Sequence, residues 1–292
     1  MPHADSNGVR LYFEEAGRGA PIIFVHEFAG DLRSWEPQLR HFSRRYRCIA
    51  FNARGYPPSD VPKSRSQYSQ VAAIEDIRSI MRHLRLAKAH IIGCSMGGYA
   101  TLLFGLAYPR LAHSLTAIGA GSGSDPLQRK QFLAASAAAV DRYEEGGLAA
   151  ALKPYMTQAN RVQLMAKDPR AWAEFAAHFL EGSALGRAHT VRGVTMRRPS
   201  IYSLERGFAR LAVPTHLIVG DEDEDPLGPN LFIKRVCAAA RLTVVPSSGH
   251  VVNVEEPQIF NRITGDFLSL VDSGGWRPRG RPAARGATAK RQ

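Results

Sequence analysis

The sequence predicts a single large α/β domain with a mostly parallel sheet, and three observations support this prediction. Short apolar runs typical of buried strands alternate with amphipathic helical segments over residues 9–118, and the alternation resumes at residue 216. Residues 122–210 show only helical patterning between these two parts. The chain has 292 residues, of which 45% are hydrophobic and 22% charged, enough for one packed core. We therefore expect a core formed by residues 1–121 and 211–272, interrupted by a helical cap over residues 122–210.

The first part of the chain contains the expected strands and their connecting helix. We expect strands at residues 9–14, 22–25, 48–51, 89–94 and 115–118. Apolar residues recur at helical spacing in Val71, Ile74, Ile77, Met81 and Leu84. This pattern predicts a helix that connects the strand ending at Phe51 to the strand ending at Cys94, as a crossover between parallel strands requires.

One turn in this first part has the pattern Gly-x-Ser-x-Gly, in the stretch Gly93-Cys94-Ser95-Met96-Gly97-Gly98. Glycines two residues before and two after Ser95 permit a tight strand-to-helix turn that holds the serine in a strained backbone conformation. The helix expected over residues 97–106 then puts its free N–H groups beside the Ser95 hydroxyl, where they favour developing negative charge. Small residues around a serine also occur in plain helix–strand packing, so the motif alone does not define a nucleophile.

An acid and a base follow Ser95 in the order that an acyl-transfer serine requires in this architecture. The strand expected at residues 216–219 ends in the acidic run Asp221 to Asp225, and the strand at residues 242–245 leads into a loop that ends at His250. A helix over residues 231–236 fits between them. His250 is the candidate base, and both Asp223 and Asp225 are candidates for the acid.

With these motifs the chain from about residue 9 to about residue 271 resembles the serine hydrolases of the α/β-hydrolase fold, which have a mostly parallel sheet flanked by helices and a helical cap. A further match is the strand at residues 22–25 that leads into His26-Glu27-Phe28-Ala29-Gly30. The resemblance implies that the backbone N–H groups of Phe28 and Met96 form the oxyanion hole. It also favours Asp223 as the acid, three residues after a glycine, while Asp225 keeps support from the spacing to Pro229.

The chain departs from the family pattern at two neighbouring places. Glu27 stands where the family usually has glycine, and Asn52 and Pro57 replace an acid and a glycine in the run around Arg54. We expect Glu27 to point away from the nucleophile and to pair with a base such as Arg54, so that His26, Glu27 and Arg54 support the pocket. The alternative is that Glu27 reaches the pocket and tunes substrate choice or His250.

The expected cap supplies two groups of candidate pocket residues. The large side chains that could set substrate size are Phe132, Tyr143, Tyr155, Met156, Trp172, Phe175, Phe179 and Tyr202. Of these, Trp172, Phe175 and Phe179 have the spacing of a helix face, and we expect them to form the core of the cap itself. The basic residues of its later part are Arg187, Arg192, Arg197, Arg198 and Arg206. We expect a solvated face there, with attraction of an anionic substrate as the alternative.

The net charge of +12 is concentrated at the end of the chain. Six positive residues without an acid follow Asp272, namely Arg277, Arg279, Arg281, Arg285, Lys290 and Arg291. Residues 273–292 are rich in Pro, Gly and Arg, and we expect a disordered basic tail that is dispensable for folding. The chain has no interleaving of aromatic and basic residues and no nucleic-acid motif, so we expect no specific nucleic-acid partner.

The remaining features suggest a cytoplasmic protein without cofactors. No apolar run is long enough to span a bilayer, and the amino terminus lacks the pattern of a signal peptide. Cys48, Cys94 and Cys237 have neither metal-binding nor redox spacing, and we expect reduced core thiols. We expect no cofactor, no metal and no membrane partner, and a homodimer is compatible with the sequence.

The expected function is hydrolysis of a small ester or related carbonyl compound through an acyl-enzyme on Ser95. Dehalogenases and epoxide hydrolases of this fold need a carboxylate nucleophile, which Ser95 excludes. Carbon–carbon bond hydrolases typically have Asn before the serine and Trp after the histidine, whereas this chain has Cys94 and Val251. Cofactor-free haloperoxidases and acyltransferases use the same triad and stay open, as does a small-ligand receptor with slow turnover.

Overall fold

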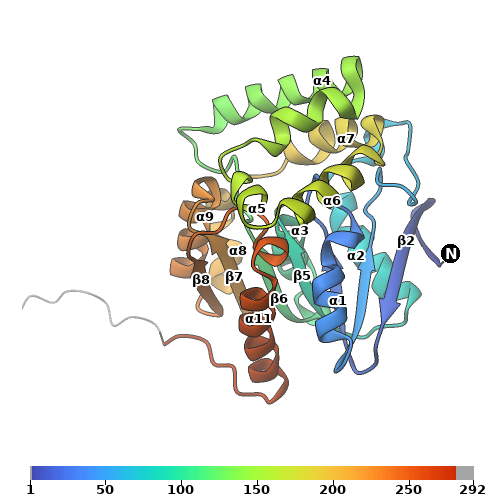
Figure 1. Ribbon diagram of the computed structural model, residues 1–292. Helices are drawn as coiled ribbons and strands as arrows, with labels where there is room; N and C mark the ends of the chain where they lie inside the picture. Colours follow the sequence, from blue (N-terminus) through green and yellow to red (C-terminus); the bar gives the residue numbers. More distant parts are fainter. Residues whose placement is uncertain (1, 281–292) are drawn as a thin grey trace, which may run out of the picture.

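The computed structural model describes residues 2–280 and is organised around one eight-stranded sheet (Figure 1). The strand order is β1-β2-β4-β3-β5-β6-β7-β8. The strands are β1 His3–Ser6, β2 Val9–Ala16, β3 Ala20–Val25, β4 Tyr46–Phe51, β5 Ala89–Cys94, β6 Ala112–Ile118, β7 Thr215–Gly220 and β8 Ala240–Val245. The pairs β1–β2 and β2–β4 are antiparallel and the other neighbours are parallel. The mostly parallel sheet predicted from the sequence is therefore confirmed.

Helices connect the strands and cover both faces of the sheet. They are α1 Glu36–Phe42, α2 Gln70–His83, α3 Met96–Ala107, α4 Arg129–Met156, α5 Val162–Lys167, α6 Pro169–Leu180, α7 Ala184–Thr190, α8 Glu205–Arg210, α9 Glu224–Val236, α10 Val252–Glu255 and α11 Pro257–Asp272. A π-helical turn, Val191–Thr195, follows α7, and short 3₁₀ turns lie at Leu32–Trp35, Arg65–Gln67, Pro109–Leu111 and Ile201–Leu204.

The two faces of the sheet make two separate hydrophobic cores. Successive residues of a strand point to opposite faces, so Ile23 and Ile91 belong to one core, while Ile22 and Ile92 belong to the other. Side chains of α2, α3, α8 and α9 pack on the first face. Side chains of α1, α10 and α11 pack on the second. The helix predicted from the apolar spacing at residues 71–84 is α2, and its inner positions lie in the first core.

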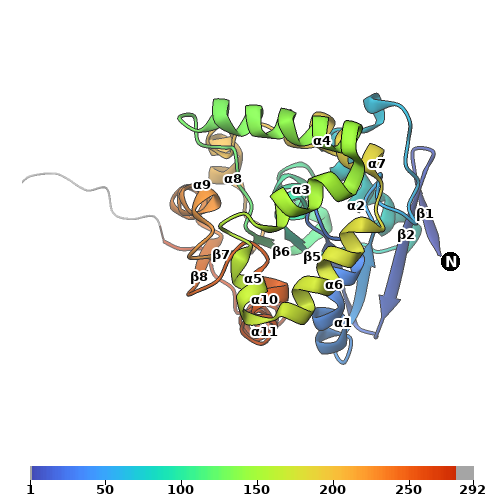
Figure 2. The same cartoon turned by 45° about the horizontal axis from the view of Figure 1, so that its top comes forward.

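A layer of helices covers the end of the sheet at which β5 runs into α3 (Figures 1 and 2). We call α4–α7 and the π-helical turn, residues 129–195, the helical layer. The described residues contain no strand between Ile118 and Thr215. The helix α4 bends at Gly147, which has a positive φ of 66°. Phe175 and Phe179 join Tyr143 and Met156 in a third apolar cluster inside this layer, as the helix-face spacing predicts.

The far end of the expected cap packs differently from its helices. Ile201 and Phe208 are fully buried and belong to the core between α3, α9 and the sheet. Residues 201–210 therefore contact the sheet core more than the helical layer, which the apolar pattern of so short a segment does not reveal.

The amino-terminal strand β1 is absent from our sequence-based expectation. Its sequence His3-Ala4-Asp5-Ser6 is mostly polar because β1 is an edge strand that pairs only with β2. The link is Asn7-Gly8, where both residues have positive φ, at 55° and 80°. Asn-Gly between two strands is a strong hairpin signal, so the sequence did contain the information for this element.

The expectation of a disordered tail from residue 273 is wrong for its first part. The Trp276 ring packs edge-on against Phe267 of α11, with ring centroids 4.9 Å apart. The Arg279 amide donates a hydrogen bond to the Ala238 carbonyl oxygen at 2.9 Å. The Trp276 ring and the hydrogen bonds of Arg279 thus hold residues 273–280 against the core. The rest of the expected tail, residues 281–292, lies outside the described residues. Within residues 2–280, no helix is both long and apolar enough to cross a membrane.

Gly97 allows the first turn of α3 to lie directly against β3. A Cβ atom at Gly97 would lie 2.1 Å from the Val25 carbonyl oxygen, which is backbone and cannot move aside. Gly265 in the middle of α11 is a contrasting case, because a Cβ there would meet only the Phe42 ring at 3.8 Å.

We predict that Gly97→Ala destabilises the fold by roughly 3 kcal/mol or more because backbone must shift. Gly265→Ala, the control, is expected to stabilise the fold by about 0.5–1 kcal/mol because alanine favours the helix. Urea unfolding followed by circular dichroism measures both changes. Equal effects of the two substitutions would contradict the role assigned to the contact between Gly97 and Val25.

Candidate active site

Ser95 occupies the sharp turn between β5 and α3. Its backbone has φ 51° and ψ −110°, a conformation that residues other than glycine rarely adopt. The Ser95 amide donates to the Ile118 carbonyl oxygen of β6 at 2.7 Å, which ties the turn to the neighbouring strand. The Ser95 side chain is partly accessible although the residues around it are buried. The predicted strand–turn–helix at Gly93–Gly98 is therefore present.

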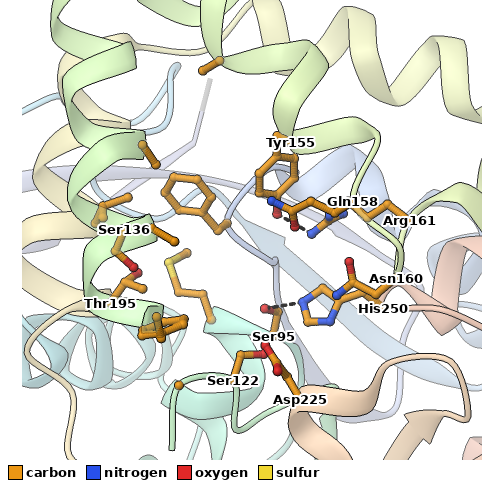
Figure 3. Close-up of a pocket in the computed structure, with 18 of the residues that line it drawn as sticks. Ser95, Ser122, Ser136, Tyr155, Gln158, Asn160, Arg161, Thr195, Asp225 and His250 are labelled. Atoms are coloured by element: carbon orange, nitrogen blue, oxygen red, sulfur yellow. Dashed lines mark hydrogen bonds between the residues drawn. The ribbon is translucent and has the colours of Figure 1, made fainter. Parts of the chain in front are cut away.

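Ser95, His250 and Asp223 form a continuous hydrogen-bonded chain (Figure 3 draws the Ser95–His250 bond). The Ser95 Oγ lies 2.7 Å from His250 Nε2, and His250 Nδ1 lies 2.6 Å from Asp223 Oδ2. A carboxylate only accepts hydrogen bonds, so Nδ1 carries the proton and neutral His250 accepts from the Ser95 hydroxyl through Nε2. Asp223 is fully buried and His250 is 5% exposed. The arrangement lets His250 receive the Ser95 proton.

The acidic run after β7 divides its carboxylates among different partners. Asp223, not Asp225, contacts the His250 ring. Asp225 instead lines the pocket, where burial and the nearby charge of Asp223 raise its pKa. Asp221 accepts from the Ser248 amide at 3.1 Å and so holds the loop that carries His250. The geometry favours the first of the two acids that the sequence leaves open.

Two residues that sequence analysis missed support this loop and its acid. Asn160, between α4 and α5, donates to Asp223 Oδ1 at 2.8 Å, and its carbonyl oxygen accepts from the His250 amide at 2.8 Å. The Glu255 carboxylate accepts from the Gly249 amide at 3.0 Å. Neither residue belongs to a recognisable motif, because both contacts depend on how distant segments pack.

Tyr56 contacts both oxyanion-hole candidates, Phe28 and Met96. Met96 is the first residue of α3, where the N–H group has no acceptor within the helix. The Tyr56 hydroxyl donates to the Phe28 carbonyl oxygen at 2.9 Å and lies 3.9 Å from the Met96 sulfur. Both Phe28 and Met96 line the same pocket as Ser95. The two residues implied by the resemblance therefore belong to the pocket that contains Ser95.

His26 supports the loop that carries Phe28. The Ala53 amide donates to His26 Nε2 at 3.0 Å, so Nδ1 bears the proton and donates to the Glu27 carbonyl oxygen at 2.7 Å. Burial lowers the pKa of His26, which keeps the ring neutral. His26 thus binds two backbone groups, and its ring packs edge-on against Tyr56 with ring centroids 4.6 Å apart.

Glu27 does not pair with Arg54, and this expectation is wrong. Its Oε2 accepts from Arg161 Nη2 at 3.0 Å and from the Tyr155 hydroxyl at 3.1 Å. Burial has the largest single effect and raises the pKa of Glu27. The charge of Arg161 and smaller effects led by His250 together outweigh it and hold the pKa below its ordinary value. Arg161 and Tyr155 belong to the helical layer, far from Glu27 in sequence, so no local pattern indicates the pairing.

Arg54 has a different partner in α2. Its guanidinium binds Asp76 through two bonds of 2.9 Å and 2.5 Å, and both side chains are buried. Asn52, at the position of the usual acid, accepts from the Leu32 amide at 2.8 Å and donates to the Pro57 carbonyl oxygen at 2.7 Å. Asp76 therefore provides the counter-charge of Arg54, in place of both Glu27 and an acid at position 52.

The pocket above Ser95 has a volume of about 410 Å³ and lies between the sheet end and the helical layer. Phe132, Tyr143 and Tyr155 line it, as proposed for part of the aromatic set, whereas Met156, Trp172, Phe175, Phe179 and Tyr202 do not. Its polar lining residues are Ser95, Ser122, Gln128, Gln131, Ser136, Arg142, Gln158, Asn160, Arg161, Thr195, Arg198, Asp225 and His250.

The expected solvated arginine face is wrong for two of its members. Arg187 is 1% exposed and lies among the rings of Phe28, Tyr56 and Phe179, and Arg198 is 6% exposed and lines the pocket. Arg192 pairs with Glu144, while Arg197 and Arg206 are exposed as expected. Helical spacing alone does not reveal which of these side chains fold inward.

The described residues contain no group of three or more His, Cys, Asp or Glu side chains that could hold a metal ion. Cys48, Cys94 and Cys237 are buried and unpaired, and burial raises the pKa of each thiol.

The fold and the Ser–His–Asp arrangement together define a hydrolase of the α/β type, and comparison with known proteins agrees. The family model of the alpha/beta hydrolase fold matches residues 20–257. The chain therefore belongs to the α/β-hydrolase family of enzymes.

Relatives cover most of the chain at low identity. A provisionally named 2-succinyl-6-hydroxy-2,4-cyclohexadiene-1-carboxylate synthase of Bacillus subtilis (strain 168) is 27% identical over 91% of this chain and 97% of its own length. The solved enol-lactonase of Burkholderia xenovorans LB400 superimposes with a TM-score of 0.81 at 20% identity, covering 92% of this chain and 100% of its own. A thermophilic esterase of Thermogutta terrifontis has a TM-score of 0.82 at 22% identity, covering 92% and 98%. The two structures share the fold with this chain.

We predict that Asp223→Asn lowers kcat by about 10⁴, because an amide can hold the His250 ring in the wrong tautomer. Asp225→Asn is the matched control, and its loss should be far smaller since Asp225 does not contact the ring. Hydrolysis of 4-nitrophenyl acetate by both purified variants measures the difference. A larger loss in Asp225→Asn would transfer the role to that residue.

We predict that Glu27→Gln destabilises the protein by about 3–5 kcal/mol, because it leaves the buried Arg161 cation without its counter-charge. The double variant Glu27→Gln/Arg161→Met should recover part of this loss, since both charges are then gone. Urea unfolding of the three proteins provides the measurement. A change within about 0.5 kcal/mol for Glu27→Gln would show that the pair is not important for stability.

Proposed function

We propose that this enzyme hydrolyses a small ester, lactone or related carbonyl compound through an acyl-enzyme on Ser95. The observation that carries the proposal is the hydrogen-bonded chain of Ser95, His250 and Asp223 at the floor of a pocket. The strained backbone of Ser95 adds support, because such strain persists where the surrounding structure maintains it for function.

In the proposed reaction Ser95 attacks the substrate carbonyl carbon while its proton passes to His250 Nε2. The negative charge that develops on the carbonyl oxygen is stabilised by the N–H groups of Phe28 and Met96. His250 then gives its proton to the leaving oxygen. The alcohol departs when the substrate is an ester, and it stays attached to the acyl chain when the substrate is a lactone. Water, activated in turn by His250, cleaves the acyl-enzyme and restores Ser95.

Asp223 keeps the His250 ring in the tautomer that this proton transfer needs. Its second oxygen accepts from Asn160, so the carboxylate is held in one orientation. Arg161 balances the charge of Glu27 near the oxyanion hole. Without that balance, a carboxylate at this place would oppose the negative charge of the intermediate.

The pocket favours a small substrate. Its volume of about 410 Å³ lies near the lower end of the range of ligand sites, roughly 300–1,000 Å³. The esterase and the enol-lactonase with which the chain shares its fold are in keeping with an acyl substrate. Asn and Trp, typical of carbon–carbon bond hydrolases, are absent beside Ser95 and His250, where Cys94 and Val251 stand.

We predict that a fluorophosphonate probe labels the protein stoichiometrically on Ser95, because an activated serine attacks phosphorus. Peptide mass spectrometry locates the adduct, and Ser95→Ala should carry none. The labelled wild-type protein should also lose hydrolysis of 4-nitrophenyl esters, measured over many turnovers.

Absence of an adduct in a folded protein would overturn the proposal. Labelling with a single turnover per molecule would instead favour a small-ligand receptor. Transfer of the acyl group to an added alcohol in preference to water would favour an acyltransferase.

A further inference from the structure

Arg198 is a buried cation inside the candidate active site. It lies just after the π-helical turn, is 6% exposed and lines the pocket that contains Ser95. Its Nη2 donates to the Ser122 carbonyl oxygen at 2.6 Å, and the guanidinium carbon lies 4.6 Å from the centre of the Tyr99 ring. Tyr99 is on the first turn of α3, and its amide donates to the Ser95 carbonyl oxygen at 2.8 Å. These contacts hold the guanidinium at the nucleophile end of α3.

No carboxylate balances this charge within the described part of the chain. Arg198 forms no ion pair there, and its Nε is buried without a hydrogen-bond partner. Of the other buried arginines in this region, Arg54 pairs with Asp76 and Arg161 pairs with Glu27. Arg187 also has no ion pair among the described residues, but it does not line the pocket that contains Ser95. A buried guanidinium that keeps an unused donor is costly unless something else supplies the acceptor.

Two further arginines, Arg129 and Arg142, add positive charge to the side of the pocket that Arg198 lines. Arg129 donates to the Arg198 carbonyl oxygen at 3.1 Å, so a second guanidinium lies nearby. Burial and then Arg129 act to lower the pKa of Arg198, which falls to about 10, while Tyr99 raises it. At neutral pH the side chain is still charged. The half-buried Arg142 lines the same pocket.

We propose that Arg198 binds an anionic group of the substrate, above all a carboxylate, while Ser95 attacks an ester or lactone carbonyl elsewhere in the same molecule. The inference rests on the proposed function and adds the substrate class, a small ester or lactone that retains a free carboxylate. A carboxylate matches the planar fork of arginine and would supply the acceptor that Nε lacks. Ser122, Ser136 and Thr195 on the pocket wall can orient the rest of the molecule (Figure 3).

The test compares esters that differ only in charge. Monoethyl succinate, glutarate and adipate carry a carboxylate where ethyl butanoate, pentanoate and hexanoate carry a methyl group. Released ethanol measures kcat/KM for each pair. The wild-type protein should prefer at least one carboxylate ester, and Arg198→Gln should lower kcat/KM for that ester by about 10- to 100-fold, the worth of one hydrogen bond to a charged group.

Two comparisons separate binding from a structural effect. Arg198→Gln should lower the preference, the ratio of kcat/KM for the carboxylate ester to that for its methyl-terminated partner, by about 10-fold or more, because only the carboxylate ester uses the charge. Arg197→Gln is the matched control, since Arg197 directly precedes Arg198, is exposed and does not line this pocket. Equal losses on both ester series, or an unchanged preference in Arg198→Gln, would overturn the proposal. If Arg198→Gln does not fold, Arg198→Lys replaces it, because it keeps the charge but loses the fork.

A binding measurement distinguishes failure of this proposal from failure of the proposed hydrolysis. Calorimetric titration of glutarate into the Ser95→Ala protein requires no turnover. Binding that is lost on adding Arg198→Gln, and kept on adding Arg197→Gln, supports the anion site even if no ester is cleaved. No binding of succinate, glutarate or adipate to the Ser95→Ala protein would overturn the anion site while leaving hydrolysis of neutral esters intact.

Discussion

The close backbone approach at the turn between β5 and α3 is the constraint on which the rest of the site depends. Gly97 lets the start of α3 lie against β3, because a Cβ there would meet the Val25 carbonyl oxygen. Gly93 lets the same turn lie against β5, because a Cβ there would meet the Gly97 carbonyl oxygen. Ser95 is thereby brought beside the loop that carries Phe28 and is tied to β6 through its own amide. The strain at Ser95 is the consequence of this approach. The turn also presents the Ser95 hydroxyl to the pocket, where it meets His250.

The helical layer contributes to the chemistry through two adjacent residues. Asn160 binds both the Asp223 carboxylate and the His250 backbone, and Arg161 forms an ion pair with Glu27. The turn between α4 and α5 thus holds the Asp223 carboxylate in place and supplies the counter-charge of Glu27. Movement of this turn would therefore change both contacts at once.

The two buried arginines that line the pocket, Arg161 and Arg198, differ in whether the protein supplies a counter-charge. The cation of Arg161 has an acidic partner within the protein, whereas that of Arg198 has none among the described residues. A fold selected for stability alone would pair or remove such a group. Proteins keep destabilising groups mainly at functional sites, where a bound ligand can supply the missing hydrogen-bond acceptor or counter-charge.

Periodicity, glycine spacing and motif order are local properties of the chain, and they were enough to predict the sheet, the turn around Ser95 and the place of His250 as the candidate base. The acidic run after β7 left Asp223 and Asp225 as alternative acids. The contact of Asp223 with His250, the pairing of Glu27 with Arg161 and of Arg54 with Asp76, and the inward position of Arg198 could be read only from the folded protein. Buried charges pair with groups that lie near them in space, and residues distant in sequence become neighbours only when the helical layer packs on the sheet.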